Sequence, residues 1–174
     1  MKKKWIALLL VVLVAFGVTA CSGGSKGGEA QQEPEKEEVK LVTNGRLSAI
    51  EAPEGWVQGE TSSDDQLAYE TEYQEDGEDP YTVRLWIDIS DFDTPESMLE
   101  NAEENAKEWG TTYTVEEKTI GDVTFSYFIP DFGYKSMYGT KNSVTVIVSH
   151  DNEINIDDEA VQKIIKSIEV EPEE

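Results

Sequence analysis

The sequence holds one cysteine, Cys21, and one histidine, His150. A single cysteine cannot form a disulfide within the chain, so a packed hydrophobic core must hold the fold together. Common zinc ligand sets and cysteine–histidine nucleophiles are excluded by this scarcity, and a serine–histidine–acid triad would have to include His150. We expect His150 to be a solvated histidine at the end of a strand, without a catalytic role.

Basic residues are also scarce. Fourteen lysine and arginine residues stand against 37 aspartate and glutamate residues, for a formal net charge of −23. Proteins that bind nucleic acid neutralise phosphates with clustered lysine and arginine, so nucleic acid is excluded as an expected partner. The glycine spacings of dinucleotide-binding and P-loop motifs are missing too, and nucleotide binding has no support.

Long hydrophobic runs are missing except at the N-terminus. The apolar run 5–18 has 14 residues, which is shorter than the roughly 20 residues of a membrane-spanning helix. Three lysines at positions 2–4 precede it, and small residues follow it, as in a secretory signal peptide. An ordinary secretory signal, however, leaves the cysteine that follows unexplained.

The quartet Val18-Thr19-Ala20-Cys21 resembles the lipobox of bacterial lipoproteins. The resemblance implies cleavage before Cys21 and transfer of a diacylglycerol to its thiol, so Cys21 is the predicted lipidation site and residues 1–20 are the signal peptide. Each buried methylene contributes about 0.8 kcal/mol, and two or more acyl chains give stable anchoring. The predicted location is the extracytoplasmic face of the cell membrane. Cleavage removes three lysines and lowers the net charge from −23 to −26.

Two segments follow the signal peptide. Residues 21–39 comprise the lipidated cysteine and a polar, acidic stretch with too few apolar side chains to order itself, so we predict a flexible linker. Residues 40–174 have the length of one ordinary domain, and we expect a monomer.

Hydrophobic periodicity predicts several strands and two helices in this domain. Alternating apolar residues predict strands, and the predicted strands cover 46–52, a short strand from 56, 67–73, 81–89, 113–120, 123–129 and 144–149. Gly121 and Asp122 form a two-residue hairpin connection, whereas we expect 130–138 to be a loop leading into another strand and 138–142 to be a turn. A capped start at 93–96 and a stop at Gly110 predict one helix, with Trp109 on its apolar stripe. The second helix begins at 157–159. Helices separated by antiparallel hairpins predict an α+β fold with a mainly antiparallel sheet covered by two helices.

Three segments resemble the PsbP-like α/β/α sandwich of small exported bacterial proteins. They are Pro53-Glu54-Gly55-Trp56 after the first strand, the hairpin Ile120-Gly121-Asp122-Val123, and the closing Ile164-Ile165-Lys166-Ser167-Ile168. The resemblance implies the sandwich fold and non-enzymatic accessory roles. It places no functional residue on this sequence.

The abundance of carboxylate and amide oxygens raises the question of a calcium site. Oxygen-bearing side chains stand at every second position, as in an EF-hand loop, at Asp151, Glu153, Asn155 and Asp157. However, Ile156 stands where the turn glycine is needed and Gln162 where the bidentate glutamate belongs. The acidic loop 75–79 is the other place for a weak site. We expect a solubilising acidic surface, with no metal site and no cofactor.

The residues therefore favour a membrane-anchored lipoprotein whose domain is a binding or accessory module and not an enzyme. Its ligand is an unknown protein or a component of the cell envelope. One alternative is a cell-wall glycan-binding surface built from Trp86, Tyr134 and Tyr138, which requires exposed, coplanar rings. A second alternative is a carboxylate-based hydrolase, which requires two buried, facing acids in a cleft.

Overall fold

The computed structural model describes residues 39–172, and the predicted lipidation site Cys21 and signal peptide lie outside these described residues. Ten strands and two helices follow one another in the described part. The strands are β1 (Leu41–Asn44), β2 (Leu47–Ile50), β3 (Val57–Gln58), β4 (Gln66–Tyr73), β5 (Tyr81–Ser90), β6 (Tyr113–Ile120), β7 (Val123–Pro130), β8 (Lys135–Lys141), β9 (Val144–His150) and β10 (Glu169–Val170), and the helices are α1 (Pro95–Trp109) and α2 (Glu159–Lys166). Neither described helix is long and apolar enough to cross a membrane.

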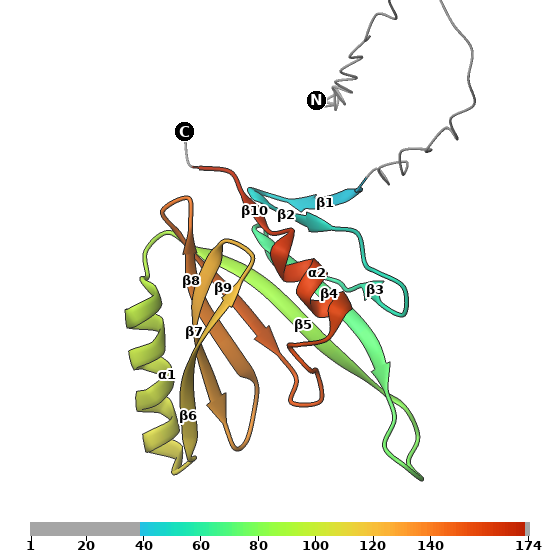
Figure 1. Cartoon of the computed structure of the whole chain (residues 1–174). Helices are drawn as coiled ribbons and strands as arrows, with labels where there is room; N and C mark the ends of the chain where they lie inside the picture. The colour runs from blue at the N-terminus through green and yellow to red at the C-terminus, as the bar shows by residue number, and fades with distance from the viewer. Residues whose placement is uncertain (1–38, 173–174) are drawn as a thin grey trace, which may run out of the picture. The chain divides into compact units, whose positions relative to one another are not determined.

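The strands form two sheets. Seven strands pair in the order β3-β4-β5-β9-β8-β7-β6, and β1, β2 and β10 form a smaller sheet. Every strand pair among residues 39–172 is antiparallel. The prediction of an α+β fold with a mainly antiparallel sheet and two helices is therefore confirmed (Figure 1). Strand β1 was not predicted, because its short sequence carries little periodicity.

The main core lies on the face of the large sheet that packs against α2 and the small sheet. Val83, Leu85 and Ile87 of β5 are buried there, as the alternation predicts. They share this core with Ile164 and Ile165 of α2. Fully burying such a side chain stabilises the fold by about 1.5–3 kcal/mol, so this layer holds the domain together without a disulfide.

Helix α1 covers part of the opposite face. It begins with a capping box, in which the Thr94 side chain accepts from the Ser97 backbone N–H, and it ends at Gly110 (φ +70°, ψ +25°). Both ends are as predicted. Ala106 is buried with Phe128 and Tyr138 of the sheet, in a second and smaller core. Figure 1 shows α1 and α2 on different sides of the large sheet.

Four local predictions were wrong. Trp109 does not pack into the second core: 78% of it is exposed, because it belongs to the last turn of α1 and lies beside an open groove. His150 is completely buried, because the core face of β9 ends on it. The predicted loop 130–138 is wrong for its second half, because β8 already begins at Lys135 and only 131–134 connect it to β7. The predicted turn 138–142 is the rest of β8, and the chain reverses at Asn142 and Ser143, which both have positive φ.

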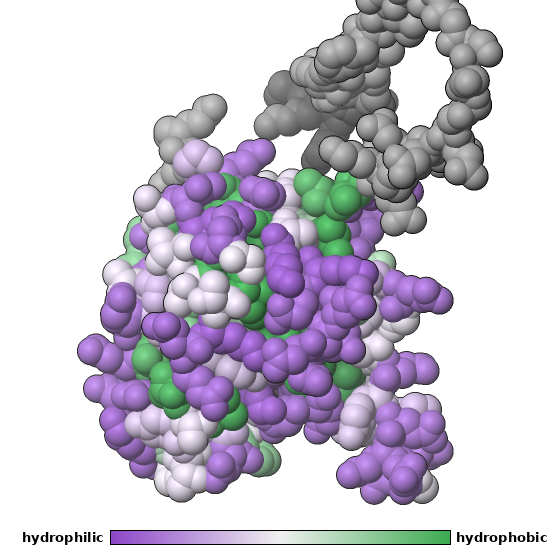
Figure 2. All heavy atoms as spheres, in the orientation of Figure 1, coloured by the Kyte–Doolittle hydropathy of each residue, from purple (hydrophilic) through white to green (hydrophobic). Residues whose placement is uncertain are grey.

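The hairpin prediction at Gly121 is confirmed. Ile120 pairs with Val123, so only Gly121 and Asp122 connect β6 to β7, and Gly121 has a φ of +64°. Figure 2 shows that hydrophilic residues make up most of the visible surface, including the projecting connection between β4 and β5. That connection contains the acidic run 75–79.

Candidate functional site

A row of four side chains crosses the sheet on the face that bears α1. The register pairs Trp86 of β5 with Ser149 of β9, Ser149 with Ser136 of β8, and Ser136 with Phe128 of β7. Residues that pair in neighbouring strands have their side chains on the same face. Two small serines thus separate two large aromatic residues, and the sheet surface is lower between them. The serine hydroxyls lie 3.0 Å apart and hydrogen-bond to each other.

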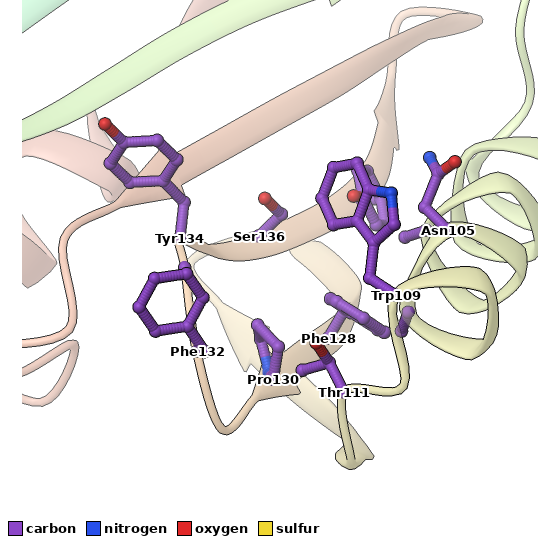
Figure 3. A pocket seen from close by; sticks show the side chains of 12 residues that line it. Asn105, Trp109, Thr111, Phe128, Pro130, Phe132, Tyr134 and Ser136 are labelled. Atoms are coloured by element: carbon purple, nitrogen blue, oxygen red, sulfur yellow. The ribbon is translucent and has the colours of Figure 1, made fainter.

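An open groove of about 420 Å³ lies between this surface and α1. Its floor includes Phe128, Pro130 and Ser136, as Figure 3 shows. Trp109 of α1 stands on one side of the groove, and Phe132 and Tyr134, from the loop between β7 and β8, stand on the other. We call this feature the aromatic groove and define it by these six residues.

The walls of the aromatic groove are unusually exposed for large aromatic side chains. Trp109 is 78% exposed, Phe132 84% and Tyr134 58%. The loop that carries Phe132 and Tyr134 is tied to the segment after α1, because the Asp131 backbone N–H donates to the Thr112 carbonyl over 2.9 Å. The two walls are therefore held by neighbouring segments.

Tyr134 is supported from behind by Trp86. Their rings meet edge to face, with centroids 5.0 Å apart and an interplanar angle of 84°, a favourable arrangement for aromatic pairs. Tyr138 is buried under α1, and this burial raises the pKa of its phenol while a hydrogen bond with Ser136 lowers it. Trp86, Tyr134 and Tyr138 therefore do not form the exposed, coplanar surface that the glycan-binding alternative requires.

The charges around the aromatic groove are negative. The six residues that define it include no lysine or arginine, and the exposed acids Glu108 and Asp131 directly precede two of its walls. Asp88 lies two positions beyond Trp86 on the same face of β5 and is half-buried. Burial raises the pKa of its carboxyl group, while a 2.7 Å hydrogen bond from Gln66 lowers it. Within residues 39–172, Asp88 has no ion-pair partner.

His150, which was predicted to be exposed, is buried and hydrogen-bonded through both of its ring nitrogens. Its Nδ1 lies 2.8 Å from the Asp151 carbonyl oxygen, to which it donates, so Nε2 accepts from the Tyr127 hydroxyl over 3.0 Å. Both contacts suit a neutral ring. Burial lowers the pKa of the imidazole, and the structure favours the neutral form.

The described residues show neither the ligand cluster of a calcium site nor the facing acids of a carboxylate-based hydrolase. Asp151 accepts from the Arg84 backbone N–H over 2.6 Å, and Asp157 pairs with Lys118 over 2.8 Å. In the part of the chain that the structure describes, no three histidine, cysteine or acidic residues are grouped to hold a metal ion. The buried polar side chains there are Thr145 and His150, so no pair of buried acids faces across a cleft between residues 39 and 172.

Only one residue of the aromatic groove was predicted from the sequence to be a contact residue. That residue is Tyr134. Trp109 was predicted to lie in the core, and no role was predicted for Phe132. The useful signal was the run Phe132-Gly133-Tyr134, in which two large aromatic residues flank a glycine between strands. Ser136 of the floor and its partner Ser149 carried no signal, because only strand pairing brings them together.

Comparison with known proteins identifies no relative by sequence: no family model and no curated protein matches the chain. Among solved structures, the chain is similar to a crystal structure from Bacteroides thetaiotaomicron VPI-5482, determined at 1.50 Å resolution. The sequence identity is 10% and the TM-score is 0.49. The match covers 78% of this chain and 49% of the other, so this chain spans about half the length of that protein.

Proposed function

We propose that this protein is an extracytoplasmic lipoprotein, anchored through Cys21, whose domain is a non-enzymatic binding module that docks a partner in the aromatic groove. The lipobox-like quartet and the preceding apolar run support the anchor. The excess of acidic residues supports a soluble domain held away from an anionic membrane surface.

The observation that carries the binding function is the exposure of Trp109, Phe132 and Tyr134 around one groove. Removing a large aromatic side chain from water contributes about 1.5–3 kcal/mol, and leaving three of them exposed forgoes that stabilisation. Tryptophan and tyrosine are also enriched among the residues that dominate the energy of protein–protein interfaces. A partner that covers these three side chains recovers the stabilisation as binding energy.

The fold proposal is a PsbP-like α/β/α sandwich. Its support is the placement of α1 on one face of the large sheet and α2 on the other, together with the three segments that resemble this family. An accessory role agrees with the binding function proposed here. It requires no catalytic residue.

Site-specific cross-linking in living cells tests the proposed docking site. A photoreactive phenylalanine analogue is placed at Trp109 or, as a control, at Phe92, which is 98% exposed and does not line the groove. We expect a discrete cross-linked product from position 109 that disappears when Phe132→Ala is added, and no such product from position 92. Equal cross-linking from both positions, or none from position 109, would overturn the proposal that the groove docks a partner.

A further inference from the structure

We infer that the occupant of the aromatic groove is an extended segment of a partner protein that carries basic side chains among apolar ones. This inference rests on the proposed binding function and specifies the chemistry of the partner. It follows from two properties of the groove, the openness of its walls and the sign of the charges around it.

The openness of the groove favours a protein segment over a small molecule. Sites for small molecules are concave and bury most of the ligand surface. Here the two outermost walls, Trp109 and Phe132, are 78% and 84% exposed, so a small ligand between them would stay largely in water. A longer chain that lies across the floor can cover the outer faces of both rings as well as the inner ones.

The floor offers a path for such a chain. The path begins on the floor at Phe128 and Ser136 and continues beyond the groove over Ser149 to Trp86, along the row of paired side chains. Apolar side chains of the partner can contact the aromatic ends of this path. The low middle of the path accommodates the partner backbone, and its polar groups lie near the two serine hydroxyls.

Three sources of negative charge surround the path. The C-terminus of α1, which carries the negative end of the helix dipole, lies at Trp109. Glu108 and Asp131 are exposed and directly precede the walls Trp109 and Phe132 in the chain, and the Asp131 carboxylate also accepts from the Thr112 hydroxyl. At the far end, Asp88 shares a face of β5 with Trp86 and is half-buried without an ion-pair partner among the described residues.

The nearby basic residues do not offset this charge. Arg84, two positions before Trp86 on the same face of β5, pairs with Glu70 over 2.7 Å. Lys107 pairs with Glu103 over 3.8 Å, one turn away on α1. Lys135 donates to the Asn152 carbonyl over 3.1 Å, and it pairs with the core residue His150, which places it on the opposite face of the sheet from Ser136. Lysine or arginine of a partner would therefore find carboxylates near Trp86 and Trp109, and aromatic faces with which a cation interacts favourably.

Binding of three matched peptide pools to the full-length chain in nonionic detergent tests this inference. In each pool of nonapeptides, alternate positions are drawn at random from leucine, isoleucine, valine, phenylalanine and tyrosine. The remaining positions are all lysine, all glutamine or all glutamate. Each pool is titrated, by fluorescence anisotropy, against wild type, the double variant Trp109→Ala/Phe132→Ala, Asp88→Asn, and the control variant Phe92→Ala.

We expect the lysine pool to bind wild type and Phe92→Ala alike, and the double variant about tenfold more weakly, since hot-spot residues are lost. Asp88→Asn should weaken the lysine pool by about threefold and leave the glutamine pool unchanged. Because the double variant keeps the net charge of wild type, its loss separates docking in the groove from diffuse attraction to an acidic protein.

Two other results would overturn the inference, and they are distinguishable. Binding that depends on the groove but is equal for all pools, or strongest for glutamate, refutes the basic partner and leaves the docking site standing. Binding of every pool that is the same for wild type and the double variant refutes the docking site itself. Unchanged melting temperatures of the variants establish that neither result reflects unfolding.

Discussion

The end of helix α1 allows a clean test of backbone conformation, because Gly110 has φ +70° and ψ +25° and an added Cβ would meet nothing within 4 Å. Any cost of Gly110→Ala therefore comes from the left-handed backbone and not from a clash. The left-handed conformation costs an ordinary residue about 1–2 kcal/mol relative to glycine. We expect Gly110→Ala to lower the free energy of unfolding by about this amount.

For a domain of this size, 1 kcal/mol corresponds to a shift in Tm of about 3–5 °C. Urea denaturation and thermal unfolding measure both quantities. The matched control is Gly110→Asn, because asparagine adopts the left-handed conformation more readily than alanine does. Asparagine is the larger residue, yet we expect it to destabilise less. If Gly110→Asn costs as much as Gly110→Ala, or if neither changes the Tm, the reasoning from backbone conformation is refuted.

Three further predictions concern the anchor, the buried histidine and the acidic surface. Cys21→Ala should release the protein from membranes or leave it as uncleaved precursor, and membrane fractionation identical to that of processed wild type would contradict the lipobox. Burial lowers the pKa of His150 below its ordinary 6.5, so the unfolded chain binds the proton more readily. The stability that the neutral ring contributes is therefore full above about 6.5 and is lost as the pH falls from there toward the lowered pKa. The stability advantage of wild type over His150→Gln, from denaturation at several pH values, should therefore shrink below that pH, and a constant difference would refute a shifted pKa. Calcium and sodium at matched ionic strength should raise the Tm alike by screening repulsion, whereas a saturable shift with calcium alone, lost with Asp151→Asn and Asp157→Asn, would establish a metal site.

Local chemistry in the sequence was sufficient for most of the secondary structure. The capping side chain of Thr94, the proline after it and Gly110 mark the ends of α1, because each satisfies or removes a backbone group within one turn. The alternation in β5 and the glycine at the hairpin between β6 and β7 act over a few residues as well. These elements, and the α+β class that their order implies, were therefore predictable.

Whether a side chain at the end of a helix or strand is buried depends on long-range packing. Trp109 fits the apolar stripe of α1, but the helix ends beside a groove and the ring stays exposed. His150 is polar and ends its strand, yet Tyr127, distant in sequence, supplies the hydrogen bond that makes its burial tolerable. A pattern within one segment specifies which face a side chain occupies, but it does not specify what covers that face.

The aromatic groove also depends on contacts between segments that are distant in sequence. Its walls come from α1 and from the loop between β7 and β8, and its floor combines residues of β7 with Ser136 of β8. Patterns within single segments predicted α1, β7 and β9, but not β8, which carries Ser136 and was expected to be a loop and a turn. Only strand register and the packing of α1 over the sheet brought the aromatic side chains together around one groove, because those contacts join residues that have no short-range relation along the chain.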